Sequence, residues 1–216
     1  MRGFLIGTLG GALAGLLAGC VPKIVAKAQS GDAAAIKQLL AAKPVSQDTK
    51  NEALVEAVMA KRDAAIGALL DGGADPAAKD ELGAETLTIA IRKEDAVAVA
   101  LLLSHKADVA SAVDVYKLAQ RDVAEALIAG GADPNAKDSE GATPLAVAAC
   151  DGKTDLVKLW LAHGAVPAKA GKACLRSHFD IESIKPACDD YATAFECAKA
   201  KGFAEIQKLL EAAGKP

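Results

Sequence analysis

Residues 138–165 read DSEGATPLAVAACDGKTDLVKLWLAHGA and hold the clearest structural pattern in the chain. Thr143 suits the N-cap of a helix, and Pro144 suits its first turn, where no backbone N–H is needed. Small residues follow, and Gly152 then permits a turn. Apolar residues in 156–161 recur at three- and four-residue spacing, which predicts one buried face on a second helix. The stretch therefore predicts two short helices joined by a tight turn.

The end of this unit recurs along the chain. Gly131-Ala132-Asp133-Pro134 repeats an earlier Gly73-Ala74-Asp75-Pro76, and weaker copies begin 33 residues after each, at Gly164 and at Lys106. A paired apolar end precedes each copy. One such helix pair cannot bury its own apolar faces, so each unit needs stacked neighbours. The periodicity predicts a repeat protein.

Composition favours helices. Apolar residues make up 52% of the 216 residues but aromatics only 3%, so Ala, Leu and Val supply most of the apolar surface. The length is ample for a core. The net charge of −3 argues against nucleic acid as a partner, because nucleic acids select basic faces.

The repeated unit resembles the ankyrin repeat, which spans about 33 residues with a Thr-Pro-Leu-His start and a closing Gly-Ala-Asp. Thr143-Pro144-Leu145 and Gly164-Ala165 carry the resemblance, with Ala146 where the family has His. Glu85-Thr86-Leu87 replaces Thr-Pro-Leu in an earlier unit. The resemblance covers most of residues 24–214. It implies an all-α solenoid of about six helix pairs with short hairpin loops and one insertion.

Six units follow from this register: 22–46, 47–78, 79–111, 112–136, 137–169 and 193–214. The fourth is about eight residues shorter than the period, so its first helix, near 113–118, is expected to be abbreviated or tilted. Lys27 in the first unit, and Gln207 and Glu211 in the last, stand where inner units are apolar. Such polar outer faces are typical of terminal capping repeats.

The first twenty residues have the layout of an export signal. Arg2 is followed by an uncharged, mostly apolar run over 4–17 and then by small residues before Cys20. The run is short for a membrane-spanning helix, which needs about 20 residues. Glycine at every fourth position over 7–19 leaves open a helix-dimerising membrane segment as a rival interpretation.

Leu17-Ala18-Gly19-Cys20 resembles the lipobox of bacterial lipoproteins. The resemblance implies a signal peptide over 1–19, cleavage before Cys20, acylation of that cysteine, and a mature chain of residues 20–216. In the Gram-negative sorting pattern, Asp directly after the lipidated cysteine retains a lipoprotein in the inner membrane. Val21 stands at this position, so the resemblance implies the outer membrane. Two or three acyl chains would anchor the chain stably, whereas one would be marginal. An ordinary signal peptide with an incidental cysteine is the alternative.

Residues 170–192 do not fit the repeat and are expected to form an insertion loop before the last unit. Insertions in repeat proteins emerge on one face, often the binding face. This one concentrates side chains of the types enriched in interface anchors. We therefore predict that Arg176, Phe179 and Tyr191 contact a partner.

Four cysteines besides Cys20 would meet an oxidising compartment if the chain is exported. Three pairings of the four are possible, and sequence does not choose among them. Cys174 and Cys188 are the candidate pair, because they would close a short loop. Cys197 aligns with an apolar core position. Cys150 is expected on the concave surface, either free or paired with the insertion.

No catalytic constellation is predicted. The three histidines are far apart in sequence, and the chain has no phosphate-binding Gly-rich loop and no Gly-x-Ser-x-Gly motif. A zinc site needs three or four converging ligands, and no such spacing is found. Cys150 with His163 imitates a nucleophile–base pair, but a surface histidine and an incidental cysteine explain them more simply. We expect no enzyme activity, metal or cofactor.

The ankyrin resemblance implies a concave binding face built from hairpin tips and first helices. By position its members are Glu81, Leu82, Arg92, Lys93, Ser139, Glu140, Ala142, Cys150, Asp151, Asp189, Asp190 and Lys201. Each alone is more simply a solvated residue, so only the set predicts binding. The predicted function is a periplasm-facing, lipid-anchored protein that binds an unidentified protein, as an accessory partner or as an immunity-type inhibitor. A structural adaptor in an outer-membrane assembly is the alternative, and an enzyme a remote one.

Overall fold

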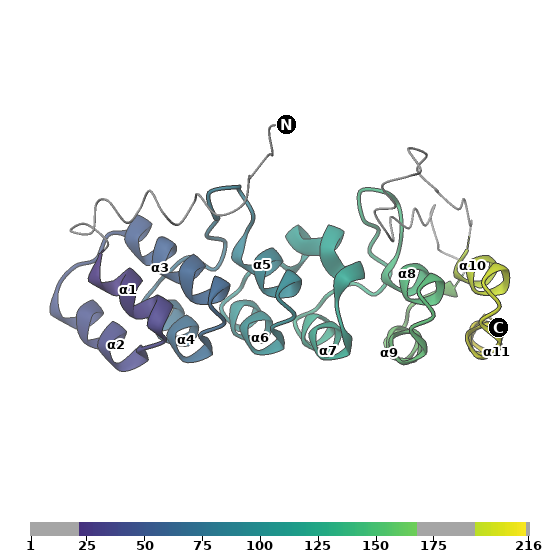
Figure 1. Cartoon of the computed structure of the whole chain (residues 1–216). Coiled ribbons are helices and arrows are strands. Elements are labelled where there is room, and N and C mark those ends of the chain that lie inside the picture. The colour runs from purple at the N-terminus through teal and green to yellow at the C-terminus, as the bar shows by residue number, and fades with distance from the viewer. Residues whose placement is uncertain (1–21, 168–192, 215–216) are drawn as a thin grey trace, which may run out of the picture.

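The computed structural model describes residues 22–167 and 193–214. Helices pair antiparallel, and the pairs stack side by side in one row, so that first helices form one layer and second helices the other (Figure 1). The helices are α1 (Lys23–Ser30), α2 (Ala33–Ala42), α3 (Gln47–Met59), α4 (Asp63–Asp71), α5 (Thr86–Arg92), α6 (Ala96–Ser104), η2 (Val109–Leu118, a 3-10 helix), α7 (Arg121–Ala129), α8 (Pro144–Cys150), α9 (Thr154–Ala162), α10 (Ala194–Ala200) and α11 (Ala204–Ala213).

The repeat register predicted from residues 138–165 is confirmed. The Thr143 side chain accepts a hydrogen bond from the Ala146 N–H, and Pro144 is the first residue of α8. Gly152 has φ +70°, and a Cβ there would lie 2.8 Å from the ring of Phe203. Both the turn and the approach of the next repeat therefore require glycine at this position.

One continuous apolar core runs between the two layers of the described repeats. Leu145, Val157 and Trp160 of the fifth repeat are each at most 2% exposed. At the two ends of the row, Lys27 and Glu211 are exposed. The terminal repeats thus turn polar faces outward, as the sequence predicted.

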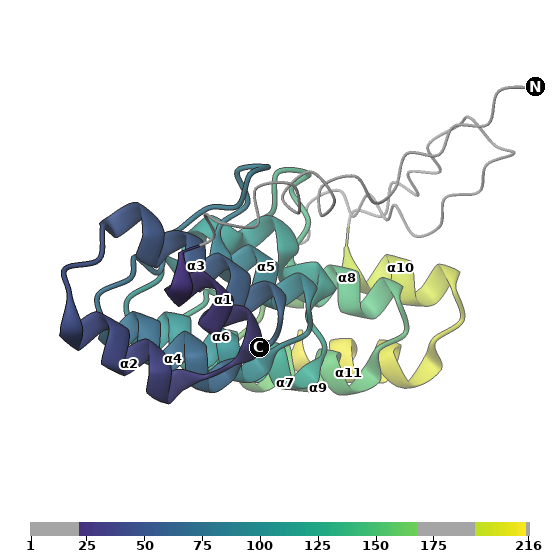
Figure 2. The ribbon, with the colours of Figure 1, turned by 60° about the vertical axis from the view of Figure 1, so that its left-hand side comes forward.

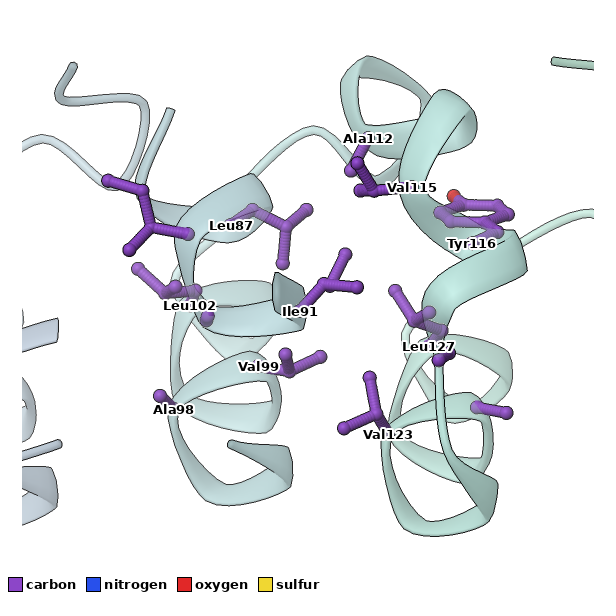
Figure 3. Close-up of a cluster of buried hydrophobic side chains, with 14 of the residues drawn as sticks. Leu87, Ile91, Ala98, Val99, Leu102, Ala112, Val115, Tyr116, Val123 and Leu127 are labelled. Atoms are coloured by element: carbon purple, nitrogen blue, oxygen red, sulfur yellow. The ribbon is translucent and has the colours of Figure 1, made fainter. Parts of the chain in front are cut away.

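The fourth repeat begins with η2 in place of an α-helix, and it starts at Val109, three residues before the predicted boundary at 112. The abbreviation of the first helix expected near 113–118 is wrong, because η2 has ten residues whereas α5 and α8 have seven each, and the 3-10 form was not foreseen. Ala112, Val115 and Tyr116 are at most 6% exposed. Figure 3 shows Ala112 and Val115 on the side of η2 that faces Leu87 and Ile91 of α5. The fourth repeat therefore keeps the core continuous, and it is short because it lacks a projecting hairpin rather than because its first helix is short.

Tyr116 fixes the fold of this segment, because its hydroxyl donates a hydrogen bond to the Val109 carbonyl at the start of η2. Burial, followed by the charges of Asp108 and Asp133, raises the pKa of Tyr116 to about 12. The unfolded chain ionises this phenol near pH 10 and the folded chain does not.

We therefore expect stability to fall as pH rises from 10 to 12, by up to about 1.4 kcal/mol per pH unit. Denaturant unfolding at a series of alkaline pH values measures this dependence, and Tyr116→Phe is the control that should remove the part of it due to this phenol. The absorbance of tyrosinate in the folded protein gives a second check. If it rises near pH 10 in the wild type and this rise is missing in Tyr116→Phe, the phenol of Tyr116 is not buried.

One disulfide lies within the described residues, between Cys150 at the end of α8 and Cys197 in α10, with 5.2 Å between the Cα atoms. Both cysteines are at most 1% exposed. The expectation that Cys150 lies on the concave surface, free or bonded to the insertion, is therefore wrong, because α8 and α10 pack directly against each other. The core position of Cys197 is confirmed. The candidate pair Cys174–Cys188 lies outside the described residues.

Among the helices of the described ranges, none combines the length and apolar character needed to span a bilayer. The proposed signal peptide and Cys20 lie outside these ranges.

Candidate functional site

Two hairpins project from the first-helix layer, one over 79–85 before α5 and one over 137–143 before α8 (Figure 1). Each tip is a tight turn built on an aspartate. Asp80 Oδ1 accepts hydrogen bonds from the Leu82 and Ala84 N–H groups at 2.9 and 2.8 Å. Asp138 Oδ1 makes the same pair of bonds at 3.0 and 2.8 Å. Both hairpins are therefore held rigidly by their own side chains.

Leu82 stands at the tip of hairpin 79–85 with 94% of its surface exposed. The equivalent position of hairpin 137–143 is occupied by Glu140, one residue before the turn glycine in both cases. Gly83 and Gly141 each have φ +83°. Because the same turn forms with glutamate, the backbone does not require a leucine at this site.

The shortened fourth repeat lies between the two hairpins and contacts both. The Ser111 hydroxyl donates a 2.7 Å hydrogen bond to Glu85 Oε2 of the first hairpin. On the other side, Asp114 Oδ1 accepts a 2.6 Å hydrogen bond from the Ser139 N–H of the second. The repeat thus ties the hairpins together although it contributes no projecting hairpin of its own.

A hollow of about 390 Å³ opens where that hairpin would stand. Its lining residues come from hairpin 79–85, α5 and η2: Asp80, Leu82, Gly83, Ala84, Glu85, Thr88, Arg92 and Ser111. Arg92 is exposed at the end of α5, and within the described residues no hydrogen bond or ion pair engages its guanidinium. An apolar tip and a free cation therefore border the same hollow.

We call the surface formed by residues 79–85, 108–114 and 137–143 the hairpin edge. Its charge is mostly negative. Its charged residues are Asp80, Glu81, Glu85, Asp108, Asp114, Asp138 and Glu140, against Lys79 and Lys137. Glu85 is partly neutralised by Lys79 at 3.5 Å. Acidic residues therefore outnumber basic ones along the edge, although Asp138 is itself buried.

The structure brings together only part of the predicted concave set, and Ala142 and Cys150 are buried and so do not belong to it. Leu82 and Arg92 line one hollow, and Glu81 adjoins it. Ser139 and Glu140 lie on the second hairpin. Lys93 lies outside the hollow at the end of α5, and Asp151 pairs with Lys153 at 3.6 Å beyond α8. Asp189, Asp190, Arg176, Phe179 and Tyr191 lie outside the described residues.

Sequence reasoning missed Ser111, Asp114 and Glu85, which connect the fourth repeat to its neighbours. The available signal was the shortness of that repeat, which implied that a hairpin was missing and that its neighbours would border a gap.

The described residues hold no cluster of candidate metal ligands. No three His, Cys, Asp or Glu side chains of these ranges gather as metal ligands would. His105 Nε2 lies 3.3 Å from Asp71 Oδ1 on the second-helix side. The sulfur of Cys150 is held in the disulfide, so it does not pair with His163 as a free thiol nucleophile.

The fold resembles known structures over nearly its whole length. An ankyrin repeat domain from Acinetobacter baumannii AYE superposes with a TM-score of 0.71 at 27% identity, over 89% of this chain and 97% of that domain. The fold is an ankyrin-repeat solenoid. The human ASB11 ankyrin repeat domain matches this solenoid with a TM-score of 0.63 at 24% identity, over 90% of this chain and 85% of that one.

A sequence relative agrees with the ankyrin assignment. A putative ankyrin repeat-containing protein of Treponema pallidum (strain Nichols) is 33% identical over 113 residues, which cover 47% of this chain and 37% of that protein. The solenoid thus matches little more than a third of that relative's length. The sequence matches no protein-family model.

Proposed function

We propose that this ankyrin-repeat solenoid is a non-enzymatic protein that binds another protein through the hairpin edge. One observation carries the proposal: Leu82 is 94% exposed at the tip of a rigid turn, beside a hollow of about 390 Å³. Covering a leucine side chain contributes about 1.5–3 kcal/mol. Because the turn is already hydrogen-bonded, little conformational entropy is lost on binding. The common use of ankyrin repeats in protein–protein interaction supports the same conclusion.

The hairpin edge also constrains the chemistry of the partner. The acidic excess favours a basic contact surface, and the exposed leucine favours an apolar depression on it. Arg92, which lines the hollow, offers a donor for a carbonyl or carboxylate of the partner. The partner is therefore a protein surface that is basic around an apolar pocket.

Leu82→Glu is expected to weaken partner binding at least tenfold, equivalent to about 1.4 kcal/mol. The substitution copies Glu140 of the other hairpin, so the turn should survive. The partner is first captured from envelope fractions with the wild-type chain, and its affinity for each variant is then measured by calorimetry.

The matched control is Val97→Glu, because Val97 is also an exposed apolar residue, at 53%, in the same repeat on α6. It lies in the second-helix layer, away from the hairpin edge. Equal affinities of the Leu82 and Val97 variants would contradict the proposed site.

We further propose that the chain is exported and anchored by lipid on Cys20, in the outer membrane and facing the periplasm. The lipobox resemblance supports this anchor, and the Cys150–Cys197 disulfide is consistent with an oxidising compartment. Within that setting, the chain acts as an accessory partner or an immunity-type inhibitor. The insertion residues Arg176, Phe179 and Tyr191 supply a second contact with the partner.

Cys20→Ser is expected to abolish lipidation and to release the protein from membranes, because it removes the acylated thiol. Incorporation of labelled palmitate and fractionation of cells measure both effects. Replacement of Cys174 by serine serves as the control and should leave the label unchanged. Full labelling of the Cys20 variant would refute the lipoprotein proposal.

A further inference from the structure

The first repeat differs in charge from the rest of the chain. Residues 22–46 contain four lysines, Lys23, Lys27, Lys37 and Lys43, and a single acidic residue, Asp32. The whole chain has 28 acidic and 25 basic residues, so the remaining repeats are more acidic than the total suggests. Positive charge is thus concentrated at one end of the row of repeats, and α1 and α2 form that end (Figure 2).

Both helices of this repeat turn their lysines away from the core. In α1, Ile24, Val25 and Ala28 are buried, whereas Lys23 and Lys27 are exposed one helical turn apart. In α2, Ile36 is buried. The exposed residues of α2 follow a spacing of three and four, which places them on one helix face: Ala34, Lys37, Gln38, Ala41 and Ala42.

Most of this charge is not neutralised by the protein itself. Lys27 Nζ pairs with Asp32 Oδ2 at 2.9 Å. No ion pair with another described residue engages Lys23, Lys37 or Lys43. Lys37 and Ala41 also border a hollow of about 630 Å³, whose charged lining residues are Lys37, Lys50 and Asp71. One carboxylate therefore lies near these lysines, but no ion pair with a described residue neutralises them.

We infer that this end face, defined by Lys23, Ala34, Lys37, Ala41 and Lys43, binds the surface of a membrane that contains anionic phospholipid. The inference rests on the proposed lipid anchor, because that anchor brings the end face to the membrane. Cys20 precedes Lys23 by three residues, which span at most about 11 Å when fully extended. The Debye length at 0.1 M salt is about 10 Å. An anchored chain therefore holds these lysines within the electrostatic field of the lipid headgroups.

This contact would also orient the solenoid. Binding by the end face places the first repeat on the lipid, with the row of repeats leading away from it. The acidic hairpin edge, which begins at the third repeat, would then be held off the anionic surface and open to a partner.

The test is amine footprinting of the wild-type protein on two kinds of vesicle. One kind is phosphatidylcholine alone, and the other contains about 30% phosphatidylglycerol. Acetylation of Lys23, Lys37 and Lys43 is expected to slow at least fivefold on the anionic vesicles. Lys199 and Lys208, exposed on the last repeat, serve as internal controls and should react equally on both. Equal acetylation rates of the first-repeat lysines on the two kinds of vesicle would overturn the inference. This holds also if acetylation is slow on both kinds, as it would be if a second copy of the chain covered the end face.

A second measurement separates the end face from the anchor. Each lysine near an anionic surface contributes about 1 kcal/mol, or about fivefold in affinity. In the Cys20→Ser background, Lys23→Gln, Lys37→Gln and Lys43→Gln together should weaken sedimentation with anionic vesicles at least tenfold. Lys199→Gln, Lys201→Gln and Lys208→Gln together form the matched control.

Unchanged binding of the first triple variant would refute the end face, even if Cys20 is acylated. A loss of binding in that variant would support the end face, even if palmitate labelling shows that Cys20 is not acylated.

Discussion

Replacing Cys150 and Cys197 together by alanine is expected to lower the free energy of unfolding by about 4 kcal/mol. The bond joins residues 47 positions apart and therefore removes much of the entropy of the unfolded chain. It also fastens α10 to α8, although residues 168–192 separate the last repeat from the fifth in sequence. Denaturant unfolding followed by the fluorescence of Trp160, the single tryptophan of the chain, measures the change.

The wild-type protein with its disulfide reduced by a thiol is the control for this variant. Its free energy of unfolding should fall to the value of the double variant. Because repeats couple mainly to their neighbours, hydrogen exchange should rise most in α11. A loss below about 1 kcal/mol would show that the last repeat is held by packing alone.

Leu145→Ala is expected to destabilise the solenoid by about 2–5 kcal/mol, as deletion of a large side chain from a packed core does. Leu145 is 1% exposed on α8, inside the best-formed repeat. The chain supplies its own control, because Leu82→Ala removes the same atoms from a side chain that is 94% exposed. That control should change stability by less than about 0.5 kcal/mol. Similar losses in the two variants would contradict the burial of Leu145.

The repeat register could be predicted because its signals are local. Thr143, Pro144 and Gly152 act on their own turn of backbone, through a cap, a fixed φ and a positive φ. The apolar spacing of α9 needs only the period of one helix. The polar outer faces of the two end repeats could also be predicted from single residues, such as Lys27 and Glu211. These residues are exposed because, within the described row, their repeats have no neighbour on one side.

The disulfide could not be chosen in the same way. Short separation favoured Cys174 with Cys188, whereas Cys150 and Cys197 are joined because α8 and α10 stack across the insertion. The aligned position of Cys197 on the next first helix was the signal for this contact. This signal predicts the disulfide only if the fifth and last repeats are known to be adjacent in space.

The candidate site was predictable only in outline. Leu82 and Arg92 followed from their positions in the repeat, and both border the hollow. The hollow itself depends on how the short fourth repeat settles between its neighbours, through Ser111 with Glu85 and Asp114 with Ser139. Those contacts join residues 25 and 26 positions apart, and no local pattern encodes them.

Site-specific photo-crosslinking tests the hairpin edge most directly. A photoreactive phenylalanine analogue is placed at position 82 and, in a separate chain, at position 97, and membranes from both strains are irradiated. We expect a discrete crosslinked protein from position 82 that is absent from position 97 and that is lost when Arg92→Glu is added to the first chain. The same adduct from both positions, or an adduct from position 97 alone, would contradict binding at the hairpin edge.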